Sequence, residues 1–340
     1  MKLADYTTLG LGGPARSFVT ATTSEELVEA VRTGGDEPLL ILGGGSNVVV
    51  ADQGFPGLVI HVATRGFTVD GNRVTVAAGE GWDSVVERTV AAGLAGLECL
   101  SGIPGLAGAT PIQNVGAYGQ EVSDTIAGVR VFDREKDETL FLTNDMCDFS
   151  YRTSIFRGVP GGRPPGPAQW GNDRYVVLEV VFDLATRPGP VRYAELAASL
   201  GVEVGECAAG TAVRSSVLNL RRRKGMVIDP ADPDTRSAGS FFTNPIVAAE
   251  VVPEGAPRFA AGEGRVKVPA AWLIEQAGFG KGYAGPDGVR ISSKHTLALV
   301  TGAGATTASL ISLAREIRDG VRDRFGVELR PEPVLVGVEL

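Results

Sequence analysis

The chain has 340 residues, 44% hydrophobic and 21% charged, which is enough for two or three domains with sizeable cores. Its net charge of −8 and its pI near 5.0 argue against nucleic acid or an anionic membrane as a partner, because both would repel it. Three well-separated cysteines with no CxxC pair predict neither a disulfide framework nor a zinc site, and no other metal site is expected. The first ten residues lack the apolar core of a signal peptide, and no run of 18 apolar residues occurs, so we predict a cytoplasmic protein without membrane insertion.

The first 63 residues alternate between helix and strand signals. Thr23 and Glu26 stand in the capping-box pattern that begins a helix, and Gly34 and Gly35 end it. Apolar runs predict strands at 38–42, 48–52 and 57–62. We therefore expect a small α/β layer here.

The middle of the chain is richer in strands. Residues 67–79 predict a hairpin that turns at Asp70–Gly71, and Asp83 is expected to cap a helix that runs through Ala92. Further along, the sequence predicts a second hairpin at 128–143 and a long strand at 174–184. The Gly/Pro-rich, aperiodic stretch 158–173 is predicted to be a mobile surface excursion.

Helical character rises after residue 203. The amphipathic stretch 211–225 predicts a helix with a basic C-terminal end, and 229–238 is predicted to be a linker. The remaining expected elements are a strand-like entry at 239–247, helices at 269–278 and 306–326, and a final strand within 327–337.

Two glycine-rich segments carry the strongest functional signal. The first follows the predicted strand at 38–42 and reads Gly43, Gly44, Gly45, Ser46, Asn47. Consecutive glycines let backbone N–H groups converge on an anion, although a plain tight turn explains this segment alone equally well.

The second segment is "GIPGLAGATPIQNVGAYG", residues 102–119, which has five glycines, two prolines and no charge. Its glycines permit close backbone approach, its prolines stiffen it, and its aliphatic and amide side chains offer mixed contacts. This mixture suits a large flat cofactor that carries a pyrophosphate. The alternative is a buried structural crossover, which would not need both glycines and amides.

The chain as a whole resembles the UDP-N-acetylenolpyruvoylglucosamine reductase family. The resemblance rests on eight blocks in the family's order: "TTLGLGGPA", "LGGGSNVVVAD", "GLECLSGIPGLAGATPIQNVGAYGQE", "FSYRTSIFR", "VRSSVLNLRRRKGMVID", "AGSFFTNPIV", "AAWLIEQAGFGKG" and "ELRPEPVLVG". The stretches 158–173 and 229–238 have no counterpart in those blocks.

The resemblance implies an α+β protein with the vanillyl-alcohol-oxidase/PCMH-like FAD-binding fold. Two α/β subdomains would hold FAD, followed by a C-terminal α+β substrate-binding domain. The implied boundaries are 1–63 with strand 326–340 for the first subdomain, 64–202 for the second, and 203–325 for the substrate domain.

The resemblance also implies the reaction. NADPH would reduce FAD, and the flavin would pass hydride to the enolpyruvyl group of UDP-N-acetylglucosamine enolpyruvate, giving UDP-N-acetylmuramate. These small molecules are the implied partners. Noncovalent FAD is expected, because His61 and His295 both lie outside the flavin-pyrophosphate loop at 102–119 and are interpreted as structural.

Three residues match the family's catalytic positions. Arg152, in "SYRTS", would stabilise charge on the substrate carboxylate, for which its planar fork is suited. Ser240, in "AGSFFTNP", would be the proton donor, and Glu332, in "RPEPVLVG", would donate a hydrogen bond when protonated. Pro333 departs from the valine of many relatives, removes one strand N–H and is expected to shift Glu332 slightly.

The binding residues follow from the same blocks. The positions expected to contact FAD are Gly43, Gly44, Gly45, Ser46, Asn47, Gly102, Ile103, Gly105, Gly108, Ala109, Gln113, Asn114 and Gly116. The positions expected to contact the UDP-sugar are Tyr118, Tyr193, Lys224 and Asn244. Tyr193 matches a tyrosine that closes over the substrate in one of the family's two subtypes, which assigns the chain to that subtype.

Two other functions stay open at this stage. One is a flavin oxidase of the same fold that uses oxygen on an alcohol. The other is a noncatalytic module that binds a flavin or a nucleotide sugar. Loss of Arg152, Ser240 or Glu332 would favour the module, and none of the three is lost.

Overall fold

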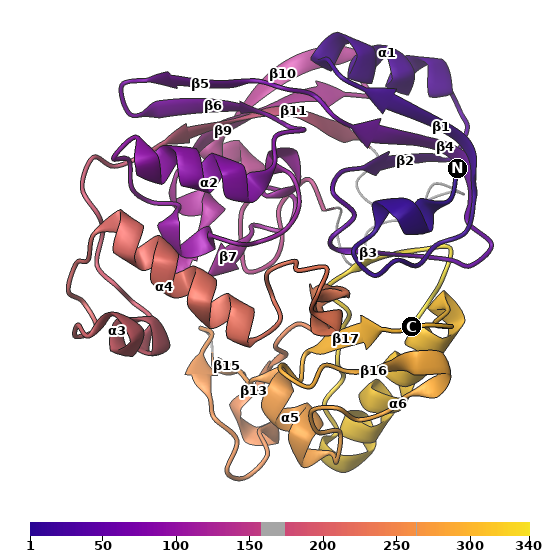
Figure 1. Cartoon of the computed structure of the whole chain (residues 1–340), viewed down its shortest axis with the longest axis vertical. Helices are drawn as coiled ribbons and strands as arrows, with labels where there is room; N and C mark the ends of the chain where they lie inside the picture. Colours follow the sequence, from indigo (N-terminus) through magenta and orange to yellow (C-terminus); the bar gives the residue numbers. More distant parts are fainter. Residues whose placement is uncertain (158–173, 263) are drawn as a thin grey trace. The chain divides into compact units, whose positions relative to one another are not determined.

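The computed structural model describes residues 1–157, 174–262 and 264–340, and these form two compact units (Figure 1). Unit 1 comprises Met1–Pro14, Gly45–Phe55 and Ile228–Leu340, and unit 2 comprises Ala15–Gly44 and Pro56–Val227. The expected excursion at 158–173 lies outside the described residues. Contacts thus divide the chain differently from the three functional domains, whose boundaries stay a prediction.

The first layer of unit 2 is the expected small α/β layer. Its sheet has the order β1-β4-β2, with β2 and β4 parallel. The bounds are β1 Ala15–Ala21, β2 Leu39–Leu42 and β4 Phe55–Val62, with helix α1 at Ser24–Gly34. Thr23 Oγ1 accepts from Glu26 N at 3.1 Å, as predicted, but the Glu26 carboxylate accepts from Thr22 N instead of Thr23 N. The reciprocal bond of the cap therefore falls one residue earlier.

The second layer of unit 2 is an antiparallel sheet of order β10-β9-β11-β6-β5 (Figure 1). The bounds are β5 Phe67–Asp70, β6 Arg73–Ala77, β9 Ile126–Asp133, β10 Glu138–Thr143 and β11 Tyr175–Asp183. Both predicted hairpins and the long strand are therefore present. The first hairpin turns at Gly71–Asn72, one residue later than predicted, because Asp70 pairs with Arg73.

Helix α2 (Trp82–Ala91) begins earlier than the sequence predicts, and Asp83 does not cap it. Its N-cap is Gly81. Asp83 Oδ1 instead accepts from the backbone N of Gly102 at 2.6 Å and pairs with Arg214 Nη1 at 2.6 Å. Burial alone raises the pKa of Asp83, but the hydrogen bonds from Arg214 and Gly102 outweigh it, so the net pKa lies below the usual range. Asp83 thus ties the 102–119 loop to two helices.

Helices α3 (Ala194–Leu200) and α4 (Gly210–Arg223) complete unit 2. They share a small apolar core with the residues just before the long loop. Its members are Cys99, Val191, Leu196, Ala197, Val213, Val217 and Leu220. The spacing of 213, 217 and 220 is that of one helical face, so the amphipathic pattern read from the sequence sets which side of α4 is buried.

The described residues of unit 1 form three small sheets and two α-helices (Figure 1). The strands are β3 Val48–Val50, β12 Ser237–Ser240, β13 Ile246–Ala248, β14 Phe259–Ala260, β15 Arg265–Lys267, β16 Val289–Ile291, β17 Ala298–Thr301 and β18 Val334–Val336. The helices are α5 Ala270–Gln276 and α6 Thr307–Phe325. Helix α6 ends at Gly326, as predicted, and β18 pairs in parallel with β3.

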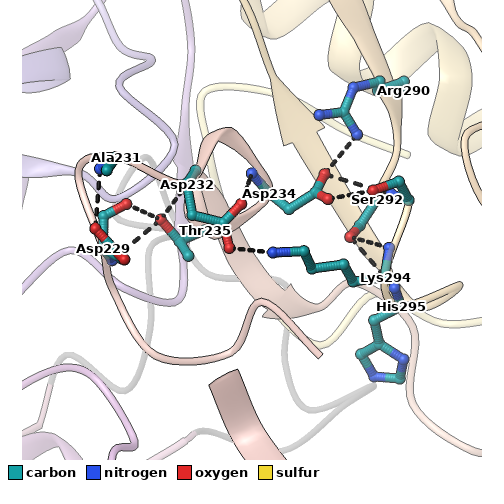
Figure 2. Close-up of polar contacts among 10 residues, drawn as sticks. Asp229, Ala231, Asp232, Asp234, Thr235, Arg290, Ser292, Lys294 and His295 are labelled. Carbon is teal, nitrogen blue, oxygen red and sulfur yellow. Dashed lines mark hydrogen bonds and ion pairs between the residues drawn. The ribbon is translucent and has the colours of Figure 1, made fainter. Parts of the chain in front are cut away.

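The predicted linker at 229–238 is wrong, because a dense polar network holds this segment within unit 1 (Figure 2). Asp234 is 3% exposed and accepts hydrogen bonds from Arg290 Nη1 at 2.6 Å and from the Ser293 hydroxyl at 2.5 Å. Lys294 Nζ lies 2.5 Å from Asp232 Oδ2. The aspartates bind partners some 60 residues away, and composition alone does not reveal such pairings.

We expect Asp234→Asn to destabilise unit 1 by about 2–3 kcal/mol, since it leaves the Arg290 charge without its buried partner. Burial raises the pKa of Asp234, but the bonds from Ser293 and Arg290 lower it below its usual value. This contribution is therefore present above pH 4 and lost as the pH falls through the lowered folded-state pKa. Denaturant unfolding between pH 7 and pH 3 measures it. The exposed Asp36→Asn is the control, and equal acid sensitivity of the two variants would contradict the assignment.

Candidate functional site

The two glycine-rich segments meet within unit 2. A Cβ added to Gly44 would lie 2.9 Å from Gly105 Cα, and Gly105 has a φ of 114°. The backbone N–H groups of Gly44 and Gly105 make no hydrogen bond to any residue that the structure describes. Close backbone approach with unused donors is what a phosphate requires, so this place fits a flavin pyrophosphate.

Positive φ falls on Gly45 and not on Gly44. Gly45 has a φ of 59°, and a Cβ there would lie 1.8 Å from the carbonyl oxygen of Tyr6. Gly45 is therefore required by packing inside unit 1, whereas Gly44 is required by its approach to Gly105. Ser46 and Asn47 follow directly, and the Asn47 carbonyl accepts from Val334 N at 3.0 Å.

Part of the 102–119 loop is bonded to the protein itself. The N–H of Gly102 is taken by Asp83, that of Gly108 by Ala78 O at 2.9 Å, and that of Ala109 by Leu106 O at 3.0 Å. A Cβ on Gly108 would also lie 2.5 Å from Ala78 Cβ. These three positions shape the loop. By contrast, the N–H of Ile103 has no partner among the described residues.

Asn114 and Gln113 lie in the interior of the loop. Asn114 is 1% exposed, its Nδ2 donates to Glu121 Oε2 at 2.8 Å, and its Oδ1 accepts from Ser123 N at 3.2 Å. Gln113 is 6% exposed. The Asn114 side chain therefore holds the loop in shape, so a contact from Asn114 to FAD would have to come from its backbone.

The loop fixes the guanidinium of Arg152. Arg152 Nη2 donates to Gly116 O at 2.7 Å, and Nη1 donates to Asn114 O at 3.3 Å. Arg152 and Asn114 both have left-handed backbones, with φ of 57° and 42°. Non-glycine residues in this region store strain that clusters at functional sites. The candidate catalytic arginine is thus preorganised by the candidate cofactor loop.

Ser240 and Glu332 are brought together in unit 1. Ser240 ends β12, and the next residue, Phe241, accepts through its carbonyl from Glu332 N at 2.9 Å. Within the described part of the chain, the Ser240 hydroxyl makes no hydrogen bond, so it does not serve as a turn hydroxyl. Pro333 lies between two donors that are both used, Glu332 N and Val334 N. The missing N–H of Pro333 therefore breaks neither of these bonds.

Three of the four candidate substrate residues form a cluster in unit 2. The rings of Tyr118 and Tyr193 meet edge to face with centroids 5.4 Å apart. Lys224 Nζ lies 5.7 Å from the Tyr118 ring centroid and 2.6 Å from Glu195 Oε2. Burial raises the pKa of Tyr118 to about 12, so its phenol stays protonated at neutral pH and can donate a hydrogen bond.

The fourth candidate, Asn244, lies in unit 1, where its side chain bonds to the N-terminus of helix α5. Its Oδ1 accepts from the backbone N of Ala270 at 2.9 Å, at the first residue of α5. The oxygen of the amide is therefore committed to the protein, which leaves the amide NH₂ for a ligand.

Metal and membrane roles find no support in the described residues. No group of three or more His, Cys, Asp or Glu residues there is arranged to hold a metal ion. Among the same residues, no helix has the length and apolar character needed to cross a membrane.

Burial lowers the pKa of His61, and the nearby charge of Arg65 lowers it further, so the neutral imidazole is favoured.

The sequence analysis gave Arg221 no role beyond the basic C-terminal end of its helix. Its Nε is buried and has no hydrogen-bond partner among the described residues. One signal was available: Arg221 lies four residues after the buried Val217, at the edge of the apolar face of α4, whereas Arg222 and Arg223 point away from it.

Two family models match the chain. The FAD-binding domain model matches residues 15–141, and the model of the C-terminal domain of UDP-N-acetylenolpyruvoylglucosamine reductase matches residues 230–336. With the α+β architecture described above, these matches define a flavoprotein of the vanillyl-alcohol-oxidase/PCMH-like fold that binds FAD, as the resemblance implied.

Relatives over the full length narrow this class. UDP-N-acetylenolpyruvoylglucosamine reductase from Streptomyces coelicolor is 54% identical and covers 99% of this chain and 90% of its own. The enzyme of the same name from Thermobifida fusca is also 54% identical, over 99% and 97%. The crystal structure of the Thermus caldophilus reductase aligns with a TM-score of 0.67 at 27% identity, over 99% and 97%. The chain belongs to the UDP-N-acetylenolpyruvoylglucosamine reductase family.

Proposed function

We propose that this chain reduces UDP-N-acetylglucosamine enolpyruvate to UDP-N-acetylmuramate with NADPH, through noncovalently bound FAD, in peptidoglycan precursor synthesis. Family membership over 99% of the chain supports the reaction. The observation that carries the site assignment is the hydrogen bond from Glu332 N to the carbonyl of Phe241, the residue after Ser240, together with a Ser240 hydroxyl that bonds to none of the described residues. The nucleotide substrates are metabolites of the cytoplasm, where we place the protein.

When bound, FAD would accept a hydride from NADPH and pass it to the enolpyruvyl carbon. Addition to an enol ether beside a carboxylate moves negative charge onto that carboxylate. Arg152 opposes this charge, because a guanidinium remains cationic and can offer two parallel donors. Its two bonds to backbone carbonyls fix the guanidinium before substrate arrives, so no reorganisation is needed during reaction.

Ser240 gives its proton to the carbon that becomes basic as the charge develops. A neutral serine is a weak acid, so it protonates only a strongly basic centre, and the enolate-like carbon is such a centre. Glu332, when protonated, donates a hydrogen bond to the same developing charge. The bond from Glu332 N to Phe241 O keeps the two residues in register.

The decisive experiment mixes the purified protein with NADPH under anaerobic conditions and then with the enolpyruvyl sugar nucleotide. We expect the yellow absorbance to bleach in the first step and to return in the second, with UDP-N-acetylmuramate formed. Denaturation should release FAD into the supernatant. Colour that returns only with oxygen would favour the oxidase, and a flavin that stays with precipitated protein would refute noncovalent binding.

Lys224→Ala is expected to weaken binding of the UDP-sugar by about 1.5–3 kcal/mol, because a charged hydrogen bond to the diphosphate is lost. Glu195→Gln is the matched partner change. It removes the carboxylate that holds Lys224 at 2.6 Å and should tighten binding by about 2- to 5-fold, as expected for a partly exposed pair. Titration calorimetry measures both. Unchanged affinity in Lys224→Ala would mean that Lys224 is only a solvated residue at the end of helix α4.

A further inference from the structure

Arg221 is a partly buried cation that forms no ion pair with a carboxylate among the described residues. Its Nη2 donates to Met226 O at 2.8 Å, and its Nε is buried without a hydrogen-bond partner in the described part of the chain. Among the described residues, no acidic group lies within ion-pair distance of it. Burial lowers the pKa of Arg221 to about 10, which still leaves it charged at neutral pH.

Arg214, two turns earlier on the same helix, shows the ordinary solution. Its guanidinium forms two hydrogen bonds with Asp83, at 2.6 and 2.9 Å. Asp83 also accepts a hydrogen bond from Gly102 N, so both of its carboxylate oxygens already have partners. Buried charges are normally paired, because an unpaired one costs several kcal/mol of desolvation. Asp83 also attracts the charge of Arg221, but it forms its ion pair with Arg214, so Arg221 itself has no anion in direct contact.

The surroundings of Arg221 indicate where that anion lies. A Cβ added to Gly102 would be 3.5 Å from Arg221 Nε and 2.8 Å from Leu218 Cδ2, so these side chains pack directly against the first residue of the loop and only glycine fits there. Gly102 has a φ of 70° and begins the candidate flavin loop. Tyr118, in the candidate substrate cluster, is close enough for the charge on Arg221 to lower its pKa against the effect of burial.

We propose that Arg221 binds the diphosphate of a nucleotide held beside Gly102. This inference rests on the proposed function, which supplies two such ligands, FAD and the UDP-sugar. Both carry the same chemistry, a diphosphate that a planar guanidinium can grip with several donors. The place beside the first glycine of the loop favours FAD.

The test compares Arg221→Met with Arg222→Met, the exposed neighbour on the same helix. FAD affinity of the apoprotein is measured by quenching of flavin fluorescence, and UDP affinity of the FAD-loaded protein by calorimetry. We expect Arg221→Met to lose about 10- to 100-fold in affinity for FAD, and Arg222→Met to lose none. A loss confined to UDP would assign the contact to the substrate instead. No loss for either ligand overturns the proposal.

Thermal unfolding separates ligand binding from a structural role. If Arg221 serves the ligand, the apoprotein of Arg221→Met should melt at or above the wild-type temperature, because a buried unpaired charge has been removed. The rise in melting temperature on adding FAD should shrink. A lower melting temperature without any loss of affinity would instead mean that Arg221 only holds Met226.

If Arg221→Met does not fold, the same affinities are measured for Arg221→Lys. This variant keeps the positive charge and loses the planar guanidinium with its several donors. Wild-type affinity for both FAD and UDP in Arg221→Lys would then overturn the proposal. A failure of the proposed function is distinguishable from a failure of this proposal. If the wild-type protein binds FAD but does not turn over the enolpyruvyl sugar, the proposed function is wrong, and the affinity measurements on the Arg221 variants still apply.

Discussion

Ser240→Ala is expected to slow reduction of the enolpyruvyl sugar by about 10²–10⁴-fold while NADPH oxidation stays close to wild type. The two half-reactions separate because oxidation of NADPH involves no protonation at the substrate carbon. The loss should appear in kcat more than in KM, since the hydroxyl matters only once that carbon becomes basic. The unused hydroxyl at the end of β12 is the structural basis for this expectation.

Anaerobic stopped-flow absorbance resolves the two half-reactions of the Ser240 variants. Ser240→Cys should recover part of the activity, because a thiol is the stronger acid, and the exposed Ser17→Ala should behave as wild type. Equal slowing of both half-reactions would mean that Ser240 positions the site as a whole. The proton donor would then have to be sought elsewhere, with Glu332 the next candidate.

Gly44→Val is expected to abolish FAD binding, with affinity lower by about 100-fold or more. The cause is close packing and not backbone strain, because Gly44 has no positive φ. The first side-chain carbon would already meet Gly105 Cα at 2.9 Å, and the branched remainder would fill the space proposed for the phosphates. Even Gly44→Ala should therefore weaken binding measurably.

The flavin content of purified protein, read from its visible absorbance, measures this effect. Gly66→Ala is the control, because an added Cβ there would make only an ordinary 3.5 Å contact with Ala77. Circular dichroism establishes that each variant is folded. Full flavin content in Gly44→Val would remove this segment from the cofactor site.

Local sequence patterns predicted most helices and strands of this fold, but they did not predict contacts between residues that are distant in the sequence. Helix α6 ends at the expected glycine, and both hairpins form where the alternation places them. Asp83 looked like a cap, because helix starts favour aspartate, yet its partners lie 19 and 131 residues away. The segment 229–238 looked like a linker because the partners of Asp232 and Asp234 are also distant in the sequence.

The candidate site shows the same limit at the level of single residues. Family blocks named Arg152, Ser240 and Glu332, but only coordinates show which side chains are already committed. The side chain of Asn114, an expected FAD contact, braces its own loop, and Arg221, to which the blocks gave no role, has a buried Nε. A hydrogen-bond inventory distinguishes such cases, and a motif does not.

The discontinuity of both units has a consequence for synthesis on the ribosome. The core of unit 1 includes Leu9, Leu11 and Val49 together with residues from 238 onward, and β3 finds its parallel partner β18 only at 334–336. The N-terminal 14 residues can bond early to residues 45–55, but their apolar core partners emerge only when almost the whole chain has been made. Residues 228–340 made as a separate piece would lack part of their own core, so we expect that piece to aggregate unless residues 1–55 are supplied with it.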